Sequence, residues 1–137
     1  MKRLNINILA AFIVIMLLVV LCGCTSGAKP SADATSAANT AAERILQSFN
    51  TGNYTDFSTN FSAGANAGIN QSVFSDVKNS LTSQYGSYQS MSGPQFLANT
   101  SGDNDFAYKT KFEKGNLTFV LAMNVTNIYQ VDGVHYG

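Results

Sequence analysis

The spacing of apolar residues changes at Gly86, and this change constrains the fold more than any other feature of the chain. Before Gly86, apolar residues recur every three or four positions, which is typical of helices that bury one face. After Gly86 they alternate with polar residues, which is typical of half-buried antiparallel strands. Helices followed by a run of strands predict an α+β fold, in which N-terminal helices pack on a curved antiparallel sheet.

Three helices are predicted before the change in spacing. The segment Thr40–Glu43 has the form of a capping box, so the first helix is expected to begin at Thr40. The spacing of aromatic residues predicts a short helix over 53–61. A third helix is predicted over 71–85, where Val73, Val77, Leu81 and Tyr85 recur every four positions. Residues 62–70 are small and polar, and we expect them to form a loop.

Alternating segments after Gly86 predict an antiparallel meander. The predicted strands cover residues 88–97, 106–112, 117–125 and a final segment that begins at Ile128. Gly93 and Pro94 interrupt the first of these, which is expected to form a weaker pair of short strands. Asp132-Gly133 is interpreted either as a tight turn or as a β-bulge within the last strand.

The N-terminus has the organisation of an export signal. Basic residues precede an uncharged apolar run over 8–21, which is shorter than the roughly 20 residues that span a bilayer and suits the core of a signal peptide. The sequence from Leu21 to Cys24 follows, and it resembles the lipobox of bacterial and archaeal lipoproteins. That resemblance implies removal of residues 1–23 and attachment of a lipid to Cys24.

This signal predicts a protein held at the cell membrane by its lipid and facing outside the cytoplasm. An ordinary cleaved signal or an uncleaved anchor would also export the rest of the chain. Residues 24–39 are rich in Ser, Thr, Ala and Gly and are expected to form a flexible tether. Residues 40–137 are expected to form the folded domain.

Composition excludes several functions. The chain has eight basic and eight acidic residues and no basic patch, since acidic residues surround the one lysine cluster over 109–114, so nucleic acid is not an expected partner. After processing, Cys24 is the sole cysteine, which leaves no disulfide and no thiolate metal site. His135 is the only histidine and is expected at the surface. No catalytic residue, metal site or cofactor is predicted.

Asp103-Asn104-Asp105 has the oxygen spacing of a calcium loop. It lacks the later glycine and bidentate glutamate of an EF-hand, so we interpret it as a solvated hairpin loop.

Three tyrosines on predicted strands are candidates for the wall of a pocket, namely Tyr88, Tyr108 and Tyr129. The alternative is that their rings pack in the core and only the hydroxyls reach its rim.

Six Asn-x-Ser/Thr sequons suit a glycosylated exported protein, at Asn53, Asn60, Asn70, Asn99, Asn116 and Asn124. A drift of the composition toward uncharged polar residues explains them equally well.

A pattern of aromatic residues and glycines resembles that of known domains. The stretches that carry it are Glu43–Leu46, Phe49–Tyr54, Phe57, Phe61, Gln84–Gly86, Tyr108, Phe112-Glu113 and Ile128–Val134. Together they resemble a prokaryotic family of uncharacterised extracellular domains within the nuclear transport factor 2-like and polyketide-cyclase superfamily. The resemblance implies a cone-shaped α+β fold and no single activity, because this superfamily hosts both enzymes and non-catalytic modules.

Three functions remain open. The first is a membrane-tethered, non-enzymatic module that binds a small apolar ligand or a protein. The second is an enzyme of the cyclase-like superfamily, an isomerase or hydrolase, which requires a carboxylate or His135 beside a pocket. The third is a structural partner of other surface proteins, which is suggested by apolar Val120 and Ala122 on the second face of a strand.

Overall fold

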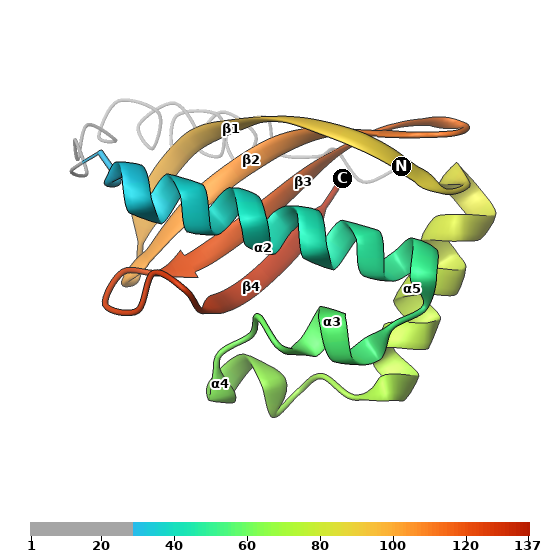
Figure 1. The fold of residues 1–137 in the computed structure, drawn as a ribbon, viewed down its shortest axis with the longest axis horizontal. Coiled ribbons are helices and arrows are strands. Elements are labelled where there is room, and N and C mark those ends of the chain that lie inside the picture. Colours follow the sequence, from blue (N-terminus) through green and yellow to red (C-terminus); the bar gives the residue numbers. More distant parts are fainter. Residues whose placement is uncertain (1–28) are drawn as a thin grey trace, which may run out of the picture.

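The structure is a computed structural model that describes residues 29–137, and element labels follow Figure 1. The helices are α2 (Ala32–Thr51), α3 (Tyr54–Ser58), α4 (Ala63–Asn66) and α5 (Gln71–Tyr85), and the strands are β1 (Tyr88–Thr100), β2 (Asp103–Phe112), β3 (Gly115–Asn124) and β4 (Val131–Tyr136). Figure 1 shows α2 lying across one face of a curved sheet. Helices α3 and α4 lie beside the edge of the sheet at β4, and α5 lies at one end of the sheet. The α+β prediction is confirmed.

Helix α2 begins well before the predicted start. Its N-cap is Ser31, whose hydroxyl oxygen accepts a hydrogen bond from the backbone amide of Ala34 at 3.1 Å. Thr40 lies inside the helix, and its hydroxyl donates to a carbonyl one turn earlier. The predicted start at Thr40 is therefore wrong, and residues 32–39, which we assigned to the tether, are helical. Alanine is the strongest helix former, and Ala38 is fully buried.

The shorter helices each begin at a side chain that accepts a backbone hydrogen bond, with Asn53 capping α3, Ser62 capping α4 and Asn70 capping α5. Helices α3 and α5 lie where they were predicted. Helix α4 lies inside the predicted loop 62–70, because one polar turn shows no apolar periodicity. Phe74 of α5 packs against Phe49 of α2 and Phe57 of α3, with ring centroids 5.8 and 4.9 Å apart.

The strands form an antiparallel meander in chain order. Strand β1 is continuous rather than the predicted broken pair, and an irregular register against β2 accommodates Gly93 and Pro94. Strand β2 already begins at Asp103. Asp103 and Asp105 therefore pair with both neighbouring strands, and the hairpin-loop interpretation of this segment is wrong.

Strand β4 begins at Val131, and the residues predicted to start it lie in the preceding turn. Its register against β3 shifts between Ala122 and Met123, which leaves Asp132 as an extra residue between paired positions. Of the two interpretations of Asp132-Gly133, the β-bulge is confirmed.

The core lies between the helices and the sheet. Buried residues alternate along β2 and β3 and pack against Ile45, Leu46 and Phe49 of α2. The residual cavity here has a volume of about 10 Å³. A single water molecule needs roughly 10–15 Å³ measured this way, so the interior of the cone is filled.

The opposite face of the sheet, which we call the outer face, carries the alternate side chains of each strand. Exposed residues on it include Ser90, Ser92, Lys109, Lys111 and Thr118. Within residues 29–137, no helix packs on this face (Figure 1). In the same range, no helix is long and apolar enough to cross a bilayer.

Candidate functional site

Tyr88, a predicted pocket residue, is buried at the start of β1. Its hydroxyl donates to the Glu43 carboxylate at 2.7 Å, and its backbone amide and carbonyl both bond to the Asn50 side chain. Burial, and then the Glu43 hydrogen bond and charge, raise the pKa of the Tyr88 hydroxyl. Tyr88 therefore remains a neutral donor that joins β1 to α2.

Tyr108 occupies a similar position on β2. Its ring is buried, its hydroxyl donates to Asn39 Oδ1 at 3.1 Å, and burial raises its pKa. Tyr88 and Tyr108 thus both connect the sheet to α2 and lie in packed protein. Tyr129 lies elsewhere, so the three tyrosines do not surround one pocket.

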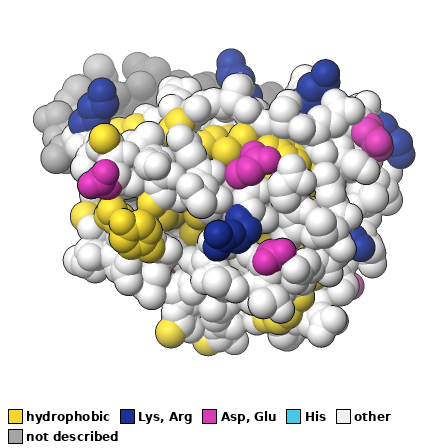
Figure 2. All heavy atoms as spheres, viewed as in Figure 1, with side chains coloured by type: hydrophobic (Ala, Val, Ile, Leu, Met, Phe, Trp, Pro, Cys, Tyr) yellow, Lys and Arg dark blue, Asp and Glu magenta, His cyan; other side chains and the backbone are white. Residues whose placement is uncertain are grey.

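Tyr129 lies in the turn between β3 and β4, and 73% of its surface is exposed. The turn is held by Asn124, whose Oδ1 accepts hydrogen bonds from the backbone amides of Thr126 and Asn127. The Tyr129 amide in turn donates to Asn127 Oδ1 at 3.3 Å. Figure 2 shows a hydrophobic patch at this turn, on a surface where charged side chains are few and scattered.

A groove of about 370 Å³ runs between Tyr129 and α2, and we call it the Tyr129 groove. It is lined by Asp33, Ser36, Ala37, Thr40, Ala41 and Arg44 of α2, with Thr59, Asn60 and Tyr129 opposite. The α2 residues recur every three or four positions, so they form one stripe along the helix. From Asp33 to Arg44 that stripe is roughly 16 Å long, at 1.5 Å per residue.

The ends of the α2 stripe carry opposite charges, Asp33 and Arg44, and hydroxyl groups lie between them. The Arg44 guanidinium donates to Asn60 Oδ1 at 3.4 Å, and Asn60 Nδ2 donates to the Asp56 carbonyl at 3.0 Å. This contact orients Arg44 and leaves most of its five N–H donors for a ligand. The lining contains one carboxylate and neither histidine nor cysteine.

The side chains of Asp103 in β2 and Asp132 in β4 meet at the end of β3, which lies between these two strands. Burial, and then hydrogen bonding and repulsion from Asp132, raise the pKa of Asp103 to about 6. Hydrogen bonds from Ser62 and Asn124 lower the pKa of Asp132, and the Asn124 contact measures 2.7 Å. Below a pH of about 6, the protonated carboxyl of Asp103 can donate to the ionised carboxylate of Asp132.

The Asp103-Asn104-Asp105 oxygens do not converge as a calcium loop requires. Asn104 is buried on the core side, where its Oδ1 accepts from Asn99, while its two neighbours face outward. Within residues 29–137, no three acidic, histidine or cysteine side chains are arranged to hold a metal ion.

Most of the sequon asparagines have structural partners. Asn53 and Asn70 cap helices, Asn60 lies in the wall of the Tyr129 groove, and Asn124 holds the Tyr129 turn. Only 8% of Asn60 is exposed. Asn99 and Asn116 are exposed on strands. Short side chains that accept backbone hydrogen bonds explain part of the asparagine excess without any glycan.

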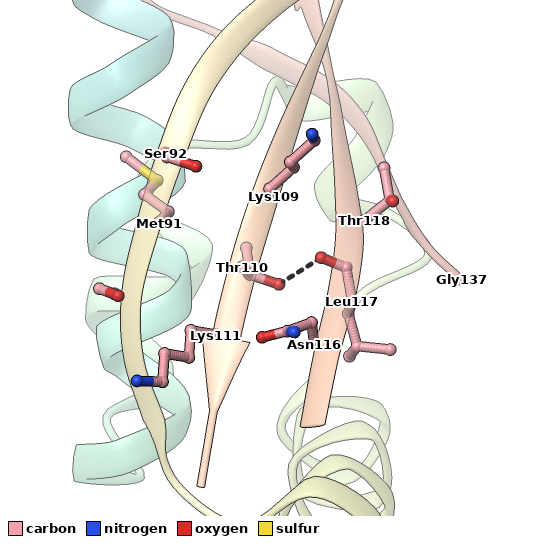
Figure 3. Close-up of a pocket in the computed structure, with 10 residues that line it drawn as sticks. Met91, Ser92, Lys109, Thr110, Lys111, Asn116, Leu117, Thr118 and Gly137 are labelled. Carbon is pink, nitrogen blue, oxygen red and sulfur yellow. Dashed lines mark hydrogen bonds between the residues drawn. The ribbon is translucent and has the colours of Figure 1, made fainter. Parts of the chain in front are cut away.

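A second groove, of about 520 Å³, lies on the outer face (Figure 3). Lys109 extends toward β3 and Lys111 toward β1, while the Thr110 hydroxyl donates to the Leu117 carbonyl at 2.9 Å. Ser90, Ser92, Asn116 and Thr118 complete its polar lining. His135, at the end of β4, is exposed on the same face of the sheet, opposite Val120.

The predicted lipid site, Cys24, and the signal segment lie outside the described residues. Residues 42–127 match the profile of a family described as "Protein of unknown function (DUF3887)". No curated protein and no solved structure matches the chain.

Proposed function

Because the chain belongs to the DUF3887 family of proteins of unknown function, we propose its role from its surfaces: an exported, lipid-anchored, non-enzymatic binding module. Its domain is of the nuclear transport factor 2-like type, and its ligand occupies the Tyr129 groove. Small apolar ligands have no room inside the packed cone, so the ligand binds at the surface.

The observation that carries this proposal is the exposure of Tyr129. A tyrosine ring has a large apolar face, and leaving it in water forgoes the stability that its burial would contribute. Here the ring is held on a turn fixed by hydrogen bonds to Asn124 and Asn127. A rigid, exposed aromatic ring offers contact area at a low cost in conformational entropy, which is typical of binding surfaces.

The lining of the groove favours an uncharged ligand rich in hydroxyl or amide groups, such as a glycan. Arg44 donates hydrogen bonds, Asp33 accepts them, and Ser36 and Thr40 do both. An anion would meet Asp33, and a cation would meet Arg44. A sugar ring has an apolar face for Tyr129 and hydroxyls for the other side chains, and an oligosaccharide suits the length of the α2 stripe.

The Glu43–Tyr88 pair is the feature nearest to an acid–base dyad, and we assign it a structural role. Tyr88 is buried, Glu43 is half-buried, and neither residue lines the Tyr129 groove or the groove on the outer face. The Tyr129 groove therefore remains the better candidate.

Isothermal titration of the full chain with chitotetraose and with maltotetraose tests the groove. We expect saturable binding of at least one probe, and we expect Tyr129→Ala to weaken it by about tenfold or more. Val125→Ala removes an exposed apolar side chain from the same turn and should change nothing. Absence of saturable binding, or equal affinity in Tyr129→Ala, would contradict the proposal.

The lipid anchor has its own test. Mass spectrometry of the mature N-terminus should find a chain that begins at Cys24 and carries acyl groups. An unmodified Cys24, with residues 1–23 still attached, would make the N-terminus a signal anchor instead.

A further inference from the structure

The groove on the outer face continues into a second hollow of about 440 Å³. Both hollows are lined by Ser92, Lys109 and Thr118, so they form one trough, which we call the outer trough. The trough follows β2 from Lys111 to Ala107, a distance of roughly 13 Å at the usual rise of a strand. It is therefore long enough for a ligand whose two ends differ in chemistry.

One end of the trough is basic and rich in hydrogen-bond donors. In the strand register, Lys109 lies between Ser92 of β1 and Thr118 of β3. Lys111, two residues further along, lies between a serine of β1 and an asparagine of β3. Figure 3 shows the two lysine side chains extending to opposite sides of β2. Because each ammonium group offers three donors and the neighbouring hydroxyl groups can also donate, this end suits an anionic head group.

The other end of the trough is apolar. It is lined by Pro94 and Leu97 of β1 and by Ala107 of β2, and 50% of the Leu97 surface is exposed. In the strand register, Val120 of β3 lies next to Ala107. An alkyl chain laid over these side chains would remove apolar surface of both partners from water, which favours binding.

The positions of the acidic residues determine how a ligand is oriented. No acidic side chain of residues 29–137 lines either part of the trough. Asp103 and Asp105 lie beyond its apolar end, on the same face of β2. A negative head group is therefore attracted to Lys109 and Lys111 and repelled from the opposite end. A flat anionic bilayer laid on this face would meet both aspartates, whereas a single molecule in the trough would not.

We propose that the outer trough binds a single-chain lipid with a phosphate head group, with the phosphate at Lys109 and Lys111 and the alkyl chain over Leu97 and Ala107. A phosphate group has more acceptor oxygens than a carboxylate, so it can accept from both ammonium groups and from the neighbouring hydroxyl groups at once. This proposal goes beyond the glycan-binding function, because the Tyr129 groove lies on the α2 side of the sheet.

Two-dimensional NMR of the isotopically labelled full chain in phosphatidylcholine nanodiscs, recorded during titration with octyl phosphate, tests the proposal. We expect saturable shift changes at Lys109, Lys111, Leu97 and Ala107. Inorganic phosphate should bind more weakly and shift the lysine end alone. Octyl glucoside, which has the same alkyl chain without the charge, should also bind more weakly. Titration of empty nanodiscs corrects each affinity for partitioning of the probe into the bilayer.

Substitutions at the two ends of the trough test the two parts of the ligand separately. Lys109→Gln/Lys111→Gln should weaken binding of octyl phosphate about fivefold, as expected for the loss of two exposed charge contacts. Leu97→Ser should weaken binding of octyl phosphate and leave binding of inorganic phosphate unchanged. Lys114→Gln removes an exposed charge outside the trough, so this matched control should bind as the wild type does.

The three probes are compared on the wild type, so the test does not depend on the folding of a variant. Absence of saturable shifts with octyl phosphate, or equal affinity for octyl phosphate and either other probe, would overturn the proposal. Shifts in the trough that follow protein concentration and not the probe would also overturn it, because a second copy would then cover this face. Oligosaccharide binding at the Tyr129 groove is measured separately, so failure of one proposal leaves the other unchanged.

Discussion

At the scale of single residues, two tyrosine hydroxyls join the sheet to α2, and they differ in the group that accepts their hydrogen bond. Tyr88 donates to the carboxylate of Glu43, whereas Tyr108 donates to the neutral amide oxygen of Asn39. A hydrogen bond to a charged group contributes more than one between neutral groups. Removing the Tyr88 hydroxyl would leave the half-buried Glu43 carboxylate with only its exposed hydrogen bond from Gln47.

We therefore expect Tyr88→Phe to lower the free energy of unfolding by about 1.5–3 kcal/mol and Tyr108→Phe by about 0.5–1.5 kcal/mol. Urea unfolding of both variants and the wild type measures this difference. The two variants are matched controls, since each removes one buried hydroxyl and keeps its ring. Equal losses, or a larger loss in Tyr108→Phe, would show that the hydrogen bond from Tyr88 to Glu43 does not contribute more than a neutral one.

The raised pKa of Asp103 predicts that stability depends on pH. Its pKa in the folded state, about 6, lies above its usual value of 3.8, so the folded protein binds this proton more tightly than the unfolded chain does. The resulting stabilisation is present below pH 3.8 and is lost as the pH rises through 6. The lowered pKa of Asp132 acts in the opposite direction, and only below its usual value of 3.8.

Above about pH 6, ionised Asp103 beside Asp132 destabilises the fold. Asp103→Asn removes this cost, because an amide can donate a hydrogen bond to Asp132 without binding a proton. We expect the variant to be more stable than the wild type by about 1 kcal/mol at roughly pH 7.5, a value discounted for partial exposure. The gain should shrink at roughly pH 4.5. Urea unfolding at both pH values measures the gain, and a gain independent of pH would refute this assignment.

At the scale of secondary-structure elements, the start of α2 decides how much of the chain is folded. Ser31 caps the helix, whereas Thr40 lies inside it. We expect Ser31→Ala to cost about 1 kcal/mol of stability and Thr40→Ala to cost almost nothing, since alanine is the better helix former. Thermal unfolding compares the two variants. A larger loss of stability in Thr40→Ala would indicate that the helix begins at Thr40, as predicted from the sequence.

The success of the sequence-based predictions differed between elements for physical reasons. Helix α5 was predicted correctly because Val73, Val77 and Leu81 recur at helical spacing, although the buried face comprises Phe74 and Leu81 and leaves Val73 exposed. The first half of α2 was missed because its buried residues are alanines, which also occur in linkers. Strand β1 was predicted as two pieces because Pro94 lacks an amide donor, but an edge strand with an irregular register tolerates proline.

At the scale of the whole molecule, the fold could be predicted from the sequence, but the position of the candidate site could not. The α+β arrangement followed from periodicity, because burying apolar faces leaves few ways to stack helices on a sheet. The candidate site did not follow. Tyr129 was grouped with Tyr88 and Tyr108 as a strand residue, but Asn124 holds it in a turn. The groove also needs α2 residues that were assigned to the tether, and such long-range proximity has no local sequence signal.

The central claim is that this domain binds its ligand on the surface beside Tyr129 and not inside the cone. Two-dimensional NMR of the isotopically labelled chain, recorded during titration with chitotetraose, tests it most directly. The account predicts progressive, saturable shift changes at Tyr129, Arg44 and Thr40, with Phe106 and Leu121 in the core unchanged. Saturable changes centred on Phe106 and Leu121, with Tyr129 unaffected, would contradict it.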